Sequence, residues 1–231
     1  MSSRGRVAGT VAIVTRGHID YRTVACLVAT EWRIHGAGPI NLDIIPGSIL
    51  PTQRNMAANT FQGEWLLFID DDMVWPPEAV QALVASWRSL RDPLAIVGAL
   101  CFARNAPYPH TLRGREWRTG LEALPVTPGL VEVDATGCAF LLIPRSAFDA
   151  VARVGTVDVE LPGAIGSKQR VHVGSEPFMW SGRSIDIAED FGFCIAARAA
   201  GCRVYVDTRI EIGHLAEGLP ITRRWHGRSE P

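Results

Sequence analysis

Short apolar runs alternate along this chain with segments whose apolar residues recur at helical spacing. The apolar runs have the length of strands and cover residues 10–15, 42–45, 65–69, 95–100, 139–143 and 204–206. The segments with helical spacing cover residues 21–35, 51–62, 76–90, 145–154 and 188–200. Strands that alternate with helices form a mostly parallel, doubly wound sheet with helices on both faces. The sequence therefore predicts an α/β fold, in which ligands bind at the carboxyl ends of the strands.

Several helix ends carry signals of their own. Pro76 and Pro77 suit a first helical turn, since the N–H that proline lacks would be unpaired there. Glu189 and Asp190 open a later helix, where carboxylates interact favourably with the positive end of the helix dipole. Gly201 follows that helix and accommodates a left-handed C-terminal cap.

The composition is that of one globular domain. No repeat or low-complexity linker divides the 231 residues, and we expect a domain at 1–215 followed by a basic C-terminal tail at 216–231. Basic and acidic residues number 23 and 24, so the formal net charge of -1 gives no overall field for a polyanion. The five cysteines are scattered without a C-x-x-C pair, which favours reduced thiols and no zinc site.

The first residues hold too few consecutive apolar positions for a signal peptide core or a membrane span. We therefore expect a cytoplasmic protein without a membrane span, in the host cytoplasm if a bacteriophage encodes it.

Three consecutive carboxylates follow an apolar strand in EWLLFIDDDMVWPPEAV, Glu64 to Val80. At ~5 Å and an effective dielectric of about 20, each like-charge pair costs on the order of 3 kcal/mol. A divalent ion removes this repulsion, and oxygen ligands of this kind select Mg²⁺ or Mn²⁺. The residues alone leave open a second interpretation, a solvated acidic turn before the helix near Pro76.

The strand followed by DDD and a proline resembles the DxD signature of GT-A glycosyltransferases, in particular the inverting, nucleotide-sugar-dependent members similar to family 2 and to small phage and bacterial enzymes. ATGCAFLLIPRSAF, Ala135 to Phe148, is similar to the loop and strand that line the donor sugar pocket. IAEDFGFCIAARAAG, Ile187 to Gly201, resembles the helix with the Glu-Asp pair, and VYVDTRIEIGHL, Val204 to Leu215, resembles strands that end in a histidine. The resemblance implies the GT-A fold, a Rossmann-like, mostly parallel central sheet.

The resemblance assigns the metal and the donor sugar to the acidic run and to two distant residues. Asp72 and His214 are expected to bind Mn²⁺ or Mg²⁺, with Asp70 near the ribose and Asp71 also on the donor side. Alternation along a strand supports this, since residues 70 and 72 then share a face. Gly137 is expected to let the backbone approach the donor closely. Taken alone, His214 equally suits a structural histidine and Gly137 a simple bend.

The resemblance places the nucleotide near the first two strands. It implies contacts from Thr15 and Arg16 after the first strand, from Asp43 after the second, and from Arg54 in PTQRNMAAN. The second strand continues as DIIPGS and not as the family's frequent V-x-D-D-x-S, which leaves the base open. Arg54 alone equally suits a surface ion pair.

The acceptor side is expected around the Glu-Asp pair. The resemblance makes Asp190 the general base and places Glu189, Trp180 and Ser181 against the acceptor. Taken alone, the two acids suit helix capping and the tryptophan suits core packing. A separate basic loop suits an anionic acceptor such as DNA or plain solvation; its residues are Arg113, Arg115 and Arg118.

These observations predict a metal-dependent glycosyltransferase of hexosyltransferase type. It would transfer a sugar from a nucleoside diphosphate, UDP by resemblance, to a hydroxyl of a protein, a glycan or a modified DNA base, with inversion. One rival is a nucleotidyltransferase, which attacks an α-phosphate with two metals, although TRGH after the first strand lacks the glycine-rich basic loop it needs. Another is a non-catalytic nucleotide- or glycan-binding module, which loss of Asp72 or Asp190 would indicate; both are present.

Overall fold

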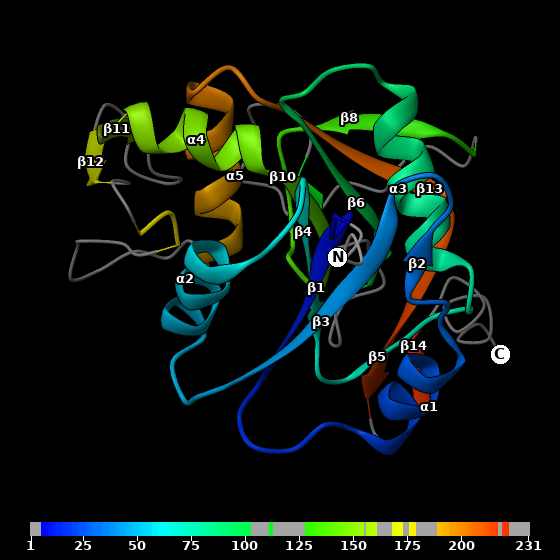
Figure 1. The fold of residues 1–231 in the computed structure, drawn as a ribbon. Coiled ribbons are helices and arrows are strands. Elements are labelled where there is room, and N and C mark those ends of the chain that lie inside the picture. Colours follow the sequence, from blue (N-terminus) through cyan, green and yellow to red (C-terminus); the bar gives the residue numbers. More distant parts are fainter. Residues whose placement is uncertain are drawn as a thin grey trace, which may run out of the picture.

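The computed structural model describes residues 6–102, 111–112, 128–154, 156–160, 168–172, 176–178, 189–216 and 219–221. The helices are α1 (Tyr21–Ala29), α2 (Leu50–Thr60), α3 (Ala79–Ser89), α4 (Arg145–Val154) and α5 (Glu189–Ala199). The longer strands are β1 (Gly9–Thr15), β3 (Gly38–Pro46), β4 (Trp65–Asp70), β6 (Ala95–Cys101), β10 (Phe140–Pro144) and β13 (Arg203–Ala216). The shorter strands are β2 (Arg33–Ile34), β5 (Met73–Val74), β7 (Thr111–Leu112), β8 (Leu130–Val133), β9 (Ala135–Thr136), β11 (Thr156–Glu160), β12 (Lys168–His172) and β14 (Leu219–Ile221). Every strand and helix that the sequence predicts is present (Figure 1).

One large sheet forms the centre of the molecule, and its strands follow the order β14-β13-β6-β10-β4-β1-β3-β2. β1 runs parallel to β3 and β4, and β13 runs parallel to β6. β10 is antiparallel to both of its neighbours, β4 and β6. The predicted mostly parallel sheet is confirmed, with β10 inserted in the reverse direction.

Helices cover both faces of the sheet, each over its own core (Figure 1). One core joins Leu66 and Phe68 of β4 to side chains of α2, α4 and α5. The other joins Trp65, Leu67 and Ile69 of the same strand to side chains of α1 and α3. Because side chains alternate along a strand, a continuously apolar β4 serves both cores.

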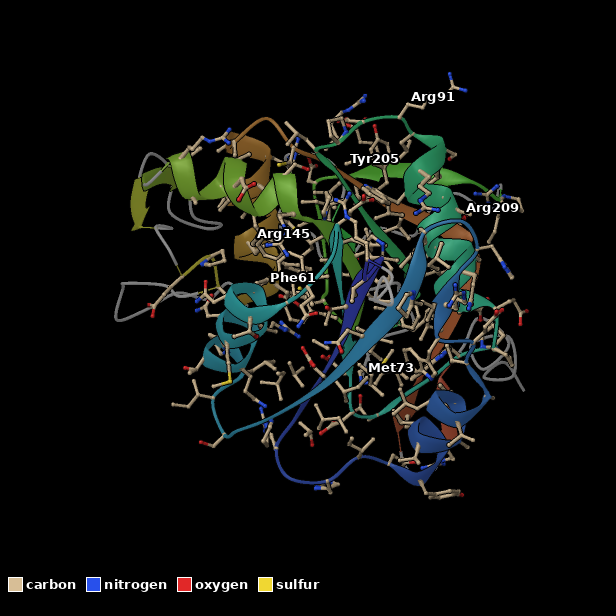
Figure 2. The ribbon with its side chains drawn as sticks, viewed as in Figure 1. Phe61, Met73, Arg91, Arg145, Tyr205 and Arg209 are labelled. Atoms are coloured by element: carbon tan, nitrogen blue, oxygen red, sulfur yellow. The ribbon has the colours of Figure 1, made fainter. Side chains whose placement is uncertain are left out.

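The parallel strands β1, β3, β4, β6 and β13 bring their carboxyl ends to one edge, the lower edge in Figure 1. At this edge β4 ends at Asp70, and the chain turns through two residues into β5. β5 pairs with β13, with Met73 opposite His214. Figure 2 labels Met73 near α1, and its carbonyl accepts a hydrogen bond from the Thr23 hydroxyl of that helix (2.8 Å). The turn after β4 is thus fixed on two sides.

α1 ends at Ala29, so the sequence prediction of a helix reaching His35 is too long. Thr30 has an extended backbone, and its hydroxyl and its N–H both donate to the Cys26 carbonyl. These bonds close the last helical turn, and the chain continues into β2.

Two other helix ends test the sequence signals. α3 begins at Ala79, with Pro76 and Pro77 in the turn before it and not in its first turn. The Pro76 carbonyl accepts from the Ala79 N–H (2.9 Å), so the prolines shape the entry to the helix. Gly201 has φ of 87°, which confirms the left-handed cap after α5.

The segment 216–231, expected as a basic C-terminal tail, contains the described strand β14. This strand pairs antiparallel with the end of β13, with Ile221 opposite His214. It therefore lengthens the main sheet beside the acidic turn.

All five cysteines are free, as the sequence predicts. Within the described ranges, no helix combines the length and apolar character needed to cross a membrane.

Phe193 anchors α5 in the core. It is fully buried and stacks on Phe178 with ring centroids 4.6 Å apart. Phe193→Ala should lower the free energy of unfolding by about 3–5 kcal/mol, because a large buried ring leaves a cavity. Val28→Ala is a control, since Val28 is 82% exposed; we expect a change of about 0.5 kcal/mol or less. Urea unfolding measures both, and equal effects would contradict the anchoring role.

Candidate active site

The loop after β1 packs against the acidic turn after β4. The Thr15 hydroxyl donates to the His18 carbonyl (2.8 Å), which shapes this loop. The Arg16 backbone N–H lies 3.4 Å from a carboxylate oxygen of Asp71. The Asp71 carbonyl accepts a hydrogen bond from the Asp20 N–H (3.0 Å). Three of the residues predicted to bind the donor, Thr15, Arg16 and Asp71, therefore lie together.

Asp72 faces His214, the other residue predicted to bind a metal. The Nε2 atom of His214 is 3.5 Å from Oδ2 of Asp72, and Nδ1 is 2.9 Å from the carbonyl oxygen of Phe102. That hydrogen bond assigns the proton of the neutral ring to Nδ1 and turns the Nε2 lone pair toward the carboxylate. Two lone pairs at this separation repel one another unless a cation or a proton lies between them. The donor set fits Mn²⁺, which accepts both oxygen and imidazole ligands.

The alternation argument for residues 70 and 72 is wrong, because β4 ends at Asp70 and the turn begins there. The turn at residues 71 and 72 directs Asp72 toward His214 of β13, and not the alternation of side chains along a strand. Among the described residues, no three His, Cys, Asp or Glu side chains converge on one point as a ready metal cage. Mg²⁺ and Mn²⁺ commonly bind through one or two carboxylates, waters and substrate phosphates, so Asp72 and His214 would hold such an ion together with the substrate.

Arg54 of α2 lies buried between two carboxylates from distant parts of the chain. Its Nη2 is 3.2 Å from Oδ1 of Asp70, and its Nη1 pairs with Oε1 of Glu189. Burial alone would lower the pKa of the guanidinium, but the acidic groups around it raise the pKa above its ordinary value. The interpretation of Arg54 as a surface ion pair is wrong, because the side chain is only 2% exposed.

Glu189 and Asp190 open α5, as the sequence predicts. Burial raises the pKa of the Glu189 carboxyl, and the charge of Arg54 opposes this change. Asp190 is buried, and its Oδ1 accepts a hydrogen bond from the Phe191 N–H (2.7 Å). The two neighbouring carboxylates therefore differ in their partners, since Glu189 pairs with a cation and Asp190 accepts a hydrogen bond from its own helix.

Sequence reasoning missed the two neighbours of Arg54. The Gln53 amide donates to the carbonyls at the ends of β1 (2.7 Å) and β3 (2.6 Å), so it ties these strand ends together. The Asn55 Oδ1 accepts from the Phe178 N–H (2.9 Å). Gln53, Arg54 and Asn55 are all buried, and each keeps one polar atom without a hydrogen-bond partner in the described structure. A helix with three successive polar residues and no broad apolar face was the signal in the sequence.

Asp43 does not follow the second strand. It lies inside β3, which continues to Pro46, and its carboxylate accepts a hydrogen bond from the Asn41 amide (2.9 Å). The expected position is wrong, because the apolar Ile44 and Ile45 extend the strand beyond it. A contact of Asp43 with a nucleotide stays a prediction.

Gly137 lies in the turn between β9 and β10, and the carbonyl of Ala139 in that turn accepts from the Asp70 N–H (3.2 Å). The turn therefore borders the acidic edge. Trp180 and Ser181 lie outside the described residues. So does the basic loop with Arg113, Arg115 and Arg118.

Residues 48–150 match the family model described as glycosyl transferase family 2. The matched segment contains α2 with Arg54, the acidic turn and the Gly137 turn. No protein in the curated set matches the sequence.

Among solved structures, A197 from STIV is similar, with a TM-score of 0.59 and 16% identity over 93% of this chain and 90% of that one. GalNAc-T7, solved with UDP, GalNAc and Mn²⁺, has a TM-score of 0.58 and 12% identity over 94% of this chain and 45% of that one. At these identities the likeness shows the fold, which is the GT-A fold. The family match and the fold together support a glycosyltransferase.

The facing pair of Asp72 and His214 makes a prediction about metal binding. Asp72→Ala and His214→Ala should each weaken Mn²⁺ binding in the presence of UDP by at least about tenfold, since each would remove a predicted ligand. Titration calorimetry with Mn²⁺ measures this, and thermal unfolding verifies that each variant folds. His35→Ala is the control, because the exposed His35 pairs with Glu31 on the surface. Unchanged Mn²⁺ affinity in His214→Ala would leave that histidine a structural role.

Proposed function

We propose that this protein is a metal-dependent, inverting glycosyltransferase of hexosyltransferase type, which transfers a sugar from UDP to an acceptor hydroxyl. One observation carries the proposal: the acidic turn after β4 meets the Glu189–Asp190 pair of α5, and Arg54 joins them. The meeting point lies at the carboxyl edge of the sheet, where α/β folds bind their ligands.

The donor would lie along the acidic turn and the loop after β1. Asp70 and Asp71 would face its ribose side, and Asp72 with His214 would hold a divalent cation beside the diphosphate. Such a cation, when bound, neutralises the charge that develops on a departing diphosphate. The GalNAc-T7 structure contains UDP and Mn²⁺, which supports a uridine carrier and manganese here.

Asp190 would be the general base. An alcohol is a weak nucleophile at neutral pH, and a carboxylate that takes its proton in the transition state contributes about 10²–10⁴-fold in rate. Attack by the acceptor oxygen on the anomeric carbon, opposite the departing diphosphate, inverts the configuration. Glu189 is engaged by Arg54, so it would orient the acceptor and not take the proton.

Asp190→Asn tests the base. The substitution keeps the shape of the side chain and removes its basicity, so transfer should fall by at least about a hundredfold while UDP affinity stays near wild type. Single-turnover transfer and calorimetry measure the two quantities. Asp149→Asn, on the exposed side of α4, is the matched control and should leave both unchanged. Near-normal transfer by Asp190→Asn, or a product with retained configuration, would overturn the assignment.

Thermal unfolding with nucleotides tests the donor. UDP with Mn²⁺ should raise the melting temperature more than CTP or ATP does, because the proposed donor carrier is UDP. A ligand at a hundred times its Kd adds about 2.7 kcal/mol to the free energy of unfolding. Asp72→Ala should lose the part that depends on Mn²⁺. Stabilisation by UDP without sugar transfer to any acceptor would favour a binding module. Release of pyrophosphate from a nucleoside triphosphate would favour a nucleotidyltransferase.

A further inference from the structure

The guanidinium of Arg54 contacts one carboxylate on the donor side and one on the acceptor side. Asp70 ends β4, and Glu189 begins α5 immediately before Asp190. We propose that Arg54 is a positioning residue, which holds the end of β4 and the start of α5 together and so fixes the general base relative to the donor. The proposal rests on the proposed function, and it replaces the expectation that Arg54 contacts the nucleotide.

The surroundings of Arg54 argue against direct nucleotide binding. Both terminal nitrogens point at carboxylates, and the guanidinium carbon lies 6.0 Å from the ring centroid of Phe68 in the core. A nucleotide would have to break an ion pair and enter the space between α2 and α5 to reach this group. The Asp70 side chain is 28% exposed whereas that of Arg54 is 2% exposed, so an approaching donor meets the carboxylate first.

The shape of the side chain suits this positioning role. A guanidinium presents several N–H donors in one rigid plane, so it satisfies two carboxylates from different directions at once. An ammonium group is a point charge on a flexible stem and holds such a pair less rigidly. The neighbouring side chains hold two further parts of the site, since Gln53 ties the ends of β1 and β3 and Asn55 binds the Phe178 N–H. These hydrogen bonds fix α2 on either side of Arg54 in the sequence, so the backbone that carries Arg54 is held in place.

The consequence for the reaction follows from the place of Glu189 in the chain. Its side chain is held by Arg54, and the next residue is the proposed base. Loss of this hold would let the first turn of α5 shift relative to the donor. A misplacement of about 1 Å costs on the order of a hundredfold in rate, whereas the proposed donor site extends beyond Asp70 to Asp71, Asp72 and His214. Arg54 should therefore affect kcat much more than the affinity for UDP.

The test combines Arg54→Met, Arg54→Lys, Glu189→Gln and the double variant R54M/E189Q. Arg54→Met should lower kcat by at least about tenfold and change the Kd of UDP with Mn²⁺ by less than about threefold. Arg54→Lys should recover part of the loss, because lysine restores the positive charge but not the rigid planar set of N–H donors. The double variant should be no slower than the slower single variant, since both changes break the same link. Arg145→Met is the matched control, because Arg145 stacks on Phe61 between α2 and α4 and should not affect kcat (Figure 2).

Four results would overturn this role. A Kd for UDP that rises more than about tenfold with kcat unchanged would place the nucleotide on Arg54. Losses in kcat that multiply in the double variant would show that Arg54 does not act through Glu189. If Arg54→Met alone does not fold, the comparison of Glu189→Gln with the double variant decides, and a further loss in the double variant counts against the proposal. Wild-type protein that binds UDP with Mn²⁺ but transfers no sugar would overturn the proposed function itself, and this role with it.

Discussion

Burial on both faces of the central strands determines where chemistry can occur in this molecule. Residues 11–14 of β1 and 65–69 of β4 are all buried, because one helical layer covers each face of the sheet. An ionised side chain within these stretches would lose its hydration without a partner, which costs several kcal/mol or more. Carboxylates therefore first occur where β4 leaves the core, at Asp70. The position of the acidic edge is a consequence of the packing that stabilises the sheet.

The carboxylates at the carboxyl edge of the sheet repel one another, so nearby positive charge is needed to stabilise them. Asp70, Glu189 and Asp190 converge in a partly buried region, and Arg54 supplies positive charge from within the protein. A buried ion pair gains little net free energy once desolvation is counted, but loss of one partner leaves a buried charge and is strongly destabilising. The main contribution of Arg54 to the fold is thus that its charge compensates the partly buried carboxylates of Asp70 and Glu189 at the site. On the other side of the turn, Asp72 faces His214 of β13, where the proposed function places a divalent ion.

The sequence predicts the sheet and the five helices of the described residues, because long apolar runs and helical periodicity depend on local residues. It predicts boundaries less well, since the end of α1 depends on the backbone turn at Thr30 and the start of α3 on the turn at Pro76. Four of the predicted site residues, Asp70, Asp72, Glu189 and His214, do meet at one edge of the sheet. The burial of Arg54 could not be predicted, because its partner Glu189 lies far along the chain and an arginine without a known partner is usually exposed. Gln53 and Asn55 were missed, although the lack of a broad apolar face on their helix was a signal in the sequence.

The turn at Asp71 divides the acidic edge into two halves that face different layers. Asp70 points to Arg54 and α5, over one face of the sheet, whereas Asp72 points to His214 on β13, which pairs with β5 beside α1. Inversion at an anomeric carbon requires that the base activates the acceptor on one side while the diphosphate departs on the other. In the proposed reaction, Asp190 of α5 serves the first task and the pair of Asp72 and His214 serves the second. A donor bound at the end of β4 would have Asp190 on one side and the pair of Asp72 and His214 on the other. The base and the cation-binding pair would then lie on the two sides that inversion requires.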